Sequence, residues 1–431
     1  MQYILVLDWS IKSPKTPYLV FDKNLTNSLK FYDVLINDAN SSTADNSFYM
    51  SLLENKSLRN RAQFLNTYFT SMNYFKSKSY KIALKVLVFG QVKIFKSNSK
   101  LRLIHSLFSL KKLALYLACV FGFLRIPRLI ILGFLKIFTK EVKDFLCDLN
   151  NRNIQYIVIK DNGRSNFYFL SYFLPPKIKV IDIIHSWDNT SLKYFPSKNV
   201  NFIATWNSQQ IREIQNISNI PSTRMNVIGS RLADSTYLKY SLSGENYNSL
   251  ANKKLLVVGM FNQSLEVMEV LKMKNFINQY NHSAYDKLFY RPHPDNLKSR
   301  KLFKKFQLDK LGVEMHTNDE IDFRDFSGII CFPTSMLLEI IISRVPAILF
   351  APKHEQYRTD PFTVYQLDHF KPIRESKPLI VCEDFKDLKH FLISGIPNQN
   401  TVDENFISQV FPNYASDYSN RIGKLINQIF I

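Results

Sequence analysis

Short, continuously apolar segments alternate with helix-like segments along most of this 431-residue chain, and this alternation is the strongest constraint on its fold. Examples are IQYIVIK at 154–160, KVIDIIH at 179–185 and LLVVGMF at 255–261. Strands that are apolar on both faces are typical of parallel sheets covered by helices on both sides. The sequence therefore predicts an α/β protein in which parallel strands alternate with helices.

Two such sets of strands and helices are separated by a polar, turn-rich stretch, SLSGENYNSLAN at 241–252. Clusters of Ser, Asn and Gly between periodic segments are typical of linkers. We therefore predict an N-terminal Rossmann-like domain at 1–240, a linker at 241–252 and a C-terminal Rossmann-like domain at 253–404. The final segment, 405–431, has a helical pattern.

Several classes of protein are disfavoured by composition and motif content. The chain has 11 glycines and contains neither G-x-G-x-x-G nor G-x-x-x-x-G-K-[ST], which disfavours a classical dinucleotide fold and a P-loop NTPase. Its 4 cysteines are widely spaced and form no C-x-x-C, as expected in a reducing cytoplasm. The first residues, MQYILVLDWS, have no basic region and predict a buried strand and no signal peptide.

The positive charge of the chain is concentrated in residues 55–140. The formal net charge is +20, and this segment holds 17 Lys and Arg but no Asp or Glu. It also contains the longest apolar run, LALYLACVFGFL at 113–124 followed by LIILGFL at 129–135. We predict that 55–140 is a helical insertion in the N-terminal domain.

Three placements of this basic, apolar insertion stay open: a spanning helix, a pair of buried helices, or helices in a membrane interface. Arg125 and Arg128 near the middle of the run oppose spanning, because each costs roughly 2.5–3.5 kcal/mol on insertion scales. We favour the interface, where apolar side chains enter the headgroup boundary and basic ones meet anionic lipid. Nucleic acid is disfavoured as a partner because the long apolar run suits lipid better.

His185 and Asp188 follow the apolar strand at 179–184, in the segment IHSWDNTSLK. Ligands of open α/β sheets bind at the carboxyl ends of strands. Both side chains can act as general base or acid, and both are candidate catalytic residues. The structural alternative is that His185 bonds a neighbouring loop and Asp188 caps the next turn.

Two further segments end predicted strands of the C-terminal domain. In FYRPHPDN, Arg291 offers a planar fork of donors to phosphate, and His293 can donate to a leaving-group oxygen. In FPTSMLLE, Thr334 and Ser335 stand at a helix start that favours an anion, and Glu339 lies one turn further on. The alternatives are a structural Arg–carboxylate pair, an ordinary N-cap and a solvated glutamate.

A polar segment at 353–370 follows the next strand and would complete a pocket beside the phosphate site; otherwise it is an exposed loop. Its candidate residues are His354, Gln356, Arg358 and His369. None of the candidate clusters has metal-ligand spacing, so neither a metal nor another cofactor is expected.

Taken together, these motifs resemble GT-B-fold glycosyltransferases of bacterial capsule and O-antigen biosynthesis. The similarity covers about 180–370. The matching motifs are SWDN at 186–189, W-N…IP…V-x-G at 206–229, RPHP at 291–294, and T-S-x-x-x-E at 334–339 with Val345-Pro346. A more distant similarity is to CDP-glycerol glycerophosphotransferases and to sialyl and Kdo transferases, and it makes His185 the counterpart of a catalytic histidine.

The resemblance implies two Rossmann-like domains facing across a cleft, an acceptor site in the first, a donor site in the second, and a terminal helix that returns to the first. It implies glycosyl transfer from a nucleotide sugar to a lipid-linked or growing glycan. The basic, apolar segment 55–140 would hold this cytoplasmic protein at the inner membrane face, beside its acceptor. Three alternatives stay open: a polyol-phosphate transferase, a nucleotide-sugar 2-epimerase of the same fold, and a non-catalytic, membrane-bound assembly factor.

Overall fold

The structure is a computed structural model that describes most of the chain. The described residues are 3–7, 33–36, 56–73, 110–136, 140–160, 167–184, 187, 200–218, 220–241, 253–260, 265–280, 283–293, 297–316, 321–354, 360–397, 404–411 and 418–430. They form two compact units. One unit comprises the residues up to Ser235 and those from Ser408 onward, and the other comprises 236–407.

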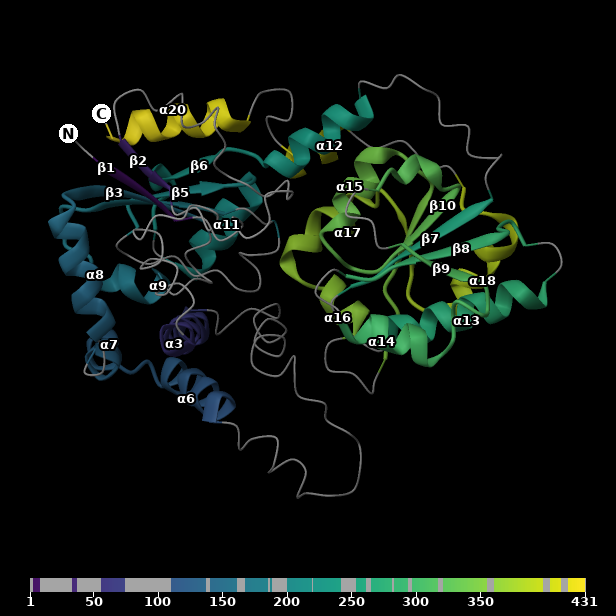
Figure 1. Ribbon diagram of the computed structural model, residues 1–431, viewed down its shortest axis with the longest axis horizontal. Helices are drawn as coiled ribbons and strands as arrows, with labels where there is room; N and C mark the ends of the chain where they lie inside the picture. Colours follow the sequence, from purple (N-terminus) through teal and green to yellow (C-terminus); the bar gives the residue numbers. More distant parts are fainter. Residues whose placement is uncertain are drawn as a thin grey trace. The chain divides into compact units, whose positions relative to one another are not determined.

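The first unit is built on a six-stranded, fully parallel sheet with the order β2-β1-β3-β4-β5-β6 (Figure 1). Its strands are β1 (Tyr3–Leu7), β2 (Asp33–Ile36), β3 (Ile154–Lys160), β4 (Lys179–Ile183), β5 (Phe202–Thr205) and β6 (Met225–Val227). Nearly every residue of β3 and β4 is buried, because helices cover both faces of a parallel sheet.

The helices of this unit include α3, α6, α7, α8, α9, α11 and α20, while α12 begins in it and continues into the second unit from Thr236. Their bounds are α3 (Lys56–Asn73), α6 (Leu110–Phe123), α7 (Arg128–Lys136), α8 (Lys140–Asn151), α9 (Phe167–Leu170), α11 (Ser208–Ile217), α12 (Arg231–Ser241) and α20 (Tyr418–Phe430). The side chain of Asn207 caps α11 by accepting from the Gln210 N–H at 3.0 Å. The short 3-10 turns η3 (Ser171–Phe173) and η4 (Ser222–Arg224) join helices to strands.

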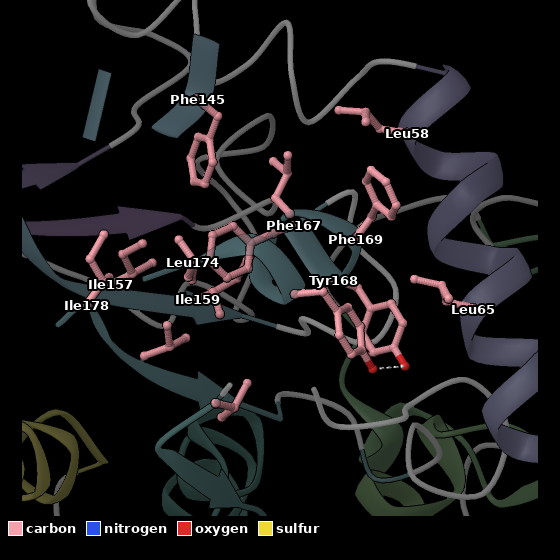
Figure 2. Packing of buried hydrophobic residues seen from close by; sticks show 14 of the residues in the cluster. Leu58, Leu65, Phe145, Ile157, Ile159, Phe167, Tyr168, Phe169, Leu174 and Ile178 are labelled. Atoms are coloured by element: carbon pink, nitrogen blue, oxygen red, sulfur yellow. Dashed lines mark hydrogen bonds between the residues drawn. The ribbon is translucent and has the colours of Figure 1, made fainter. Parts of the chain in front are cut away.

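A core rich in aromatic residues joins α3 to the sheet (Figure 2). Leu58 and Leu65 on α3 face Phe169 and Tyr168 on α9, and all four side chains are buried. The Tyr172 hydroxyl donates to the Tyr168 hydroxyl at 3.0 Å, which satisfies a polar group inside this apolar cluster. The basic helix α3 is therefore held by an ordinary hydrophobic face.

The last helix, α20, covers part of the opposite face of the same sheet. Ile422 and Ile426 are buried in a cluster with Val158 of β3 and Ile181 of β4. The Arg421 side chain donates to the Ile228 carbonyl at 2.7 Å and to the Asp234 carboxylate at 2.9 Å. The C-terminal segment thus completes the first unit.

The second unit is built on another six-stranded parallel sheet, with the order β12-β11-β10-β7-β8-β9 (Figure 1). Its strands are β7 (Lys254–Val258), β8 (Lys287–Arg291), β9 (Val313–Met315), β10 (Gly328–Cys331), β11 (Ala347–Phe350) and β12 (Ile380–Cys382). From β7 the chain proceeds outward to β8 and β9, then returns to place β10 on the other side of β7. This order is that of a doubly wound, Rossmann-like sheet.

Helices alternate with these strands. Their bounds are α13 (Leu265–Gln279), α14 (Leu297–Lys305), α15 (Met336–Ser343), α16 (Pro361–Tyr365), α17 (Lys371–Ser376) and α18 (Phe385–Ser394), with 3-10 turns η6 (Phe323–Asp325) and η7 (Asp368–Phe370). The helix α19 (Glu404–Val410) begins in this unit and continues into the first unit from Ser408. Asp360 and Asp384 cap α16 and α18 with their side chains. Arg344 ends α15 in the left-handed conformation, with φ 57°.

The predicted α/β class with two Rossmann-like parallel sheets is confirmed. The terminal helical segment predicted at 405–431 is two helices, α19 and α20. Apart from Ser241, the predicted linker 241–252 lies outside the described residues.

Gly328 in β10 provides a test of packing in the second sheet. A Cβ there would overlap the Tyr285 hydroxyl and lie 3.1 Å from Ile396 Cδ1. That hydroxyl cannot easily move, because Tyr285 is buried and accepts from the Ile396 N–H at 3.0 Å. We expect Gly328→Ala to lower the free energy of unfolding by about 1–3 kcal/mol, measured by urea denaturation.

Gly133 in α7 is the matched control, because a Cβ there meets nothing within 4 Å. Gly133→Ala should raise the free energy of unfolding by about 0.5–1 kcal/mol through helix propensity. Equal effects of the two substitutions would contradict the described packing around β10.

Candidate functional site

Polar side chains gather at the carboxyl edge of the second sheet, on both sides of the point where the strand order reverses. In doubly wound folds, ligands bind at this switch point. Here it lies between β7 and β10. Three backbone hydrogen bonds join the carboxyl ends of β10, β7, β8 and β9. They run from the Gly259 N–H to the Arg291 carbonyl, from the Phe332 N–H to the Val258 carbonyl and from the His316 N–H to the Tyr290 carbonyl, at 2.8–3.0 Å.

Directly behind this edge is a buried carboxylate, that of Glu266 in the first turn of α13. Its Oε2 accepts from the Met260 N–H at 2.7 Å, and its Oε1 accepts from the hydroxyls of Tyr290 and Ser299, both at 2.5 Å. Burial and the Glu266 carboxylate raise the pKa of Tyr290 well above its ordinary value, so its hydroxyl stays protonated and donates. Glu266 thus ties the ends of β7, β8 and α14 together.

Gly259 follows β7 and leaves the space that this carboxylate fills. A Cβ at Gly259 would lie 2.8 Å from Glu266 Oε2, which is closer than real side chains approach. A side chain at 259 would therefore push the Glu266 carboxylate away from its three donors. The lack of a side chain at Gly259 also leaves backbone at the switch point, where a ligand can approach closely.

Arg291 ends β8, and its side chain is buried at this edge. Its Nη1 donates to Nδ1 of His316, which follows β9, at 3.1 Å. Burial, together with the Arg291 charge, lowers the pKa of His316, so the ring stays neutral and can accept this bond. His316 therefore holds the guanidinium in place without neutralising its charge.

Glu339 lies in the first turn of α15, half-buried, within electrostatic range of Arg291 and of Lys239 on α12. Burial raises its pKa to about 7, although both cations act in the opposite direction. Lys239 itself donates to the Ile321 carbonyl at 2.7 Å and lies 3.9 Å from the Asp322 carboxylate. A carboxyl that is close to half ionised at neutral pH can either donate to or accept from a hydroxyl group.

Thr334 and Ser335 follow β10 and are half-buried at the start of α15. Ser335 stands at the N-cap of α15, but its side chain makes no capping hydrogen bond. The structural alternative, in which this serine is an ordinary N-cap, is therefore not what the structure shows. His293 is half-buried two residues beyond Arg291. The structure therefore places the predicted donor-binding residues after two strands, β8 and β10, that flank β7.

His354 follows β11, and its Nε2 lies 3.4 Å from Oε1 of Glu269, a buried residue of α13. Burial alone would raise the pKa of Glu269, but hydrogen bonds from His354 and Lys272 outweigh it and lower that pKa. His369, in contrast, is buried in η7 with its ring centroid 4.4 Å from that of Phe370. Gln356 and Arg358 lie outside the described residues.

The carboxyl edge of the first sheet carries the predicted catalytic segment. Trp187 is described and buried, whereas His185 and Asp188 lie outside the described residues, so their roles stay predictions. The last residue of β3, Lys160, is buried at this edge, and Asp182 is buried within the neighbouring β4. A buried lysine at a strand end, one strand from His185, is a further candidate for binding an anionic or hydroxyl-bearing ligand.

Within the described ranges, no three His, Cys, Asp or Glu side chains gather closely enough to hold a metal ion. Sequence reasoning missed Lys160, Glu266 and His316. The signal for His316 was its place directly after the run GVEM, the same pattern that identified Arg291.

No family model matches the chain, and no curated protein matches its sequence. Solved structures with a similar fold include UDP-N-acetylglucosamine 2-epimerase from Rickettsia bellii, at 9% identity and TM-score 0.49 over 100% of this chain and 96% of that one. The S. aureus MnaA–UDP structure has 11% identity and TM-score 0.47 over 100% and 96%. TarM has 13% identity and TM-score 0.41 over 67% and 58%. These similarities are too distant to assign an activity.

The raised pKa of Glu339 predicts a pH effect on stability. Between its ordinary value of 4.5 and about 7, the folded chain holds a proton that the unfolded chain has lost. Stability contributed by this group therefore falls as pH rises through that window. Glu339→Gln removes the effect, so its free energy of unfolding relative to the unsubstituted protein should increase from about pH 5 to about pH 8, measured by urea denaturation.

Glu314→Gln, at an exposed position of β9, is the matched control. A difference between Glu339→Gln and the unsubstituted protein that is constant across the window would contradict a raised pKa at Glu339.

Proposed function

We propose that this protein is a glycosyltransferase that moves a sugar from a nucleotide-activated donor to a lipid-linked or growing surface glycan. The observation that carries the proposal is the group of Arg291, Glu339 and the Thr334–Ser335 helix start at the switch point of the second sheet. This group combines a fixed cation, a hydroxyl-binding carboxyl and a helix N-terminus, which are the elements that a nucleotide diphosphate with a ribose requires.

The arrangement also suits the chemistry of transfer. Negative charge develops on the departing diphosphate when its bond to the sugar breaks, and fixed donors aimed at that charge lower the barrier. Arg291, positioned by His316, would supply a donor that needs no reorganisation during the reaction. His293 would donate to the leaving-group oxygen, and Glu339 would bind a ribose hydroxyl.

The acceptor would react at the edge of the first sheet. There Asp188 or His185 would remove the proton from the acceptor hydroxyl as it attacks the sugar. We place the protein on the inner face of the cell membrane, because its acceptor would be lipid-linked and because 17 basic residues and no acidic ones occupy 55–140.

Nucleotide binding is the direct test of the donor site. A thermal-shift screen against UDP, CMP, CDP, GDP and their sugars should show stabilisation by one nucleotide family, because a ligand that binds the folded state stabilises it by mass action. Arg291→Ala should weaken that binding by about 1.5–3 kcal/mol, the value of a hydrogen bond to a charged group, measured by titration calorimetry. His293→Ala should weaken it in the same direction.

Lys287→Ala is the matched control, because Lys287 is exposed at the opposite end of the same strand. If Arg291→Ala and His293→Ala fold and bind every nucleotide as tightly as Lys287→Ala does, the donor site is not at this edge.

The catalytic assignment is tested separately by turnover. Asp188→Asn or His185→Ala should reduce kcat by about 10²–10⁴-fold, because each removes a candidate general base, while the donor Kd stays unchanged. Turnover is measured as transfer of labelled sugar to membrane-extracted acceptor lipid. Losses below about tenfold in both variants would move the base elsewhere.

Incubating the protein with the nucleotide sugar in the absence of acceptor lipid tests the epimerase alternative. An epimerase would convert the nucleotide sugar to its C2 epimer without any acceptor, which analysis of the sugar nucleotides by chromatography would show.

A further inference from the structure

Large apolar side chains are exposed together at the bend between α6 and α7. The exposed fractions are 69% for Leu124, 82% for Leu129, 61% for Ile130 and 54% for Phe123. A single exposed apolar residue on a soluble protein is ordinary, but a contiguous group marks an interaction site. We call this group, Phe123, Leu124, Leu129 and Ile130, the α6–α7 tip.

The bend that presents the tip is a defined Schellman motif. The Ile126 N–H donates to the Phe121 carbonyl and the Arg125 N–H to the Gly122 carbonyl, both at 3.1 Å, and Arg125 has φ 51°. Pro127 then prevents α6 from continuing. The tip is therefore held by regular backbone geometry.

The inner side of the same bend is anchored to α3 and η3. The Tyr68 hydroxyl donates to the Ile126 carbonyl at 2.5 Å, and Phe64 packs edge-on against Phe121 with centroids 6.3 Å apart. The Arg128 guanidinium lies 4.5 Å from the centroid of the Tyr172 ring, so its charge faces the core side. These contacts fix which side chains of α6 and α7 face outward.

The charge of the segment that contains the tip favours an anionic partner. No acidic residue occurs between Asn55 and Lys140, and Arg125, next to Leu124 of the tip, is exposed. A second copy docked through the same surface would bring two strongly basic segments together, which is unfavourable.

The helices α6 and α7 are too short to span a membrane. At 14 and 9 residues, α6 and α7 are about 21 Å and about 14 Å long, against a hydrocarbon core of about 30 Å. No described helix is both long and apolar enough to cross a membrane.

We infer that the α6–α7 tip inserts into the headgroup boundary of an anionic bilayer, with Leu124, Leu129 and Ile130 entering the acyl region and Arg125 contacting lipid phosphates. This inference names the residues through which the protein would contact the membrane in the proposed function. It does not depend on the donor site.

The test is co-sedimentation of the full chain with vesicles of phosphatidylcholine alone or of equimolar phosphatidylcholine and phosphatidylglycerol. The unsubstituted protein should bind the anionic vesicles strongly and the neutral ones weakly, and high salt should release only part of it, because salt screens charge but not apolar insertion. Leu124→Asn/Leu129→Asn should lower the partition coefficient onto anionic vesicles by about tenfold or more.

The matched control is Leu311→Asn/Ile393→Asn, which removes two exposed apolar residues from the second unit and should bind as the unsubstituted protein does. A second measurement uses Leu129→Trp, whose added fluorescence should be quenched by brominated lipid. Equal binding by the two double variants, absence of binding by the unsubstituted protein, or an unquenched Trp at 129 would overturn the inference.

Nucleotide-induced thermal stabilisation, measured on the same variants, separates this inference from the proposed function. Stabilisation should persist in Leu124→Asn/Leu129→Asn. A protein that binds anionic vesicles through the tip but no nucleotide would refute the donor site and leave the tip assignment standing.

Discussion

Parallel pairing is the constraint on which the rest of the structure depends. Because neighbouring strands run in the same direction, every strand of a sheet delivers the residue after its carboxyl end to one edge. Arg291, His316 and Thr334, which lie far apart in the sequence, are brought to one edge in this way. In the first sheet, the same constraint brings Lys160, at the end of β3, beside the end of β4. His185 follows β4 in the sequence.

The Glu266 carboxylate supports the carboxyl edge of the second sheet by hydrogen bonding to the segments that form it. A buried carboxylate is costly unless donors surround it, and here three donors from three different segments do so. The edge is therefore held by polar contacts as well as by apolar packing. Such support keeps Arg291 and the backbone at Gly259 in fixed positions before a ligand arrives.

Most of the sheet-forming segments could be predicted from the sequence, because runs such as IQYIVIK and SGIICF are continuously apolar. The short strand β2 (DVLI) was missed because four residues in a polar context give no period. Strand order and register could not be predicted, since they depend on contacts between distant segments. For that reason the pairing of Arg291 with His316, and the burial of Glu266 and Glu269 on one helix, emerged only from the structure.

The position of α20 has a consequence for synthesis on the ribosome. The second unit has its whole chain once residue 407 has been made, whereas the first needs the last helix to cover Val158 and Ile181. Domains generally fold as units during synthesis, in the order in which their chain is completed. The second unit can therefore fold first, although its chain begins later, and the first sheet keeps an apolar face uncovered until the chain is almost finished.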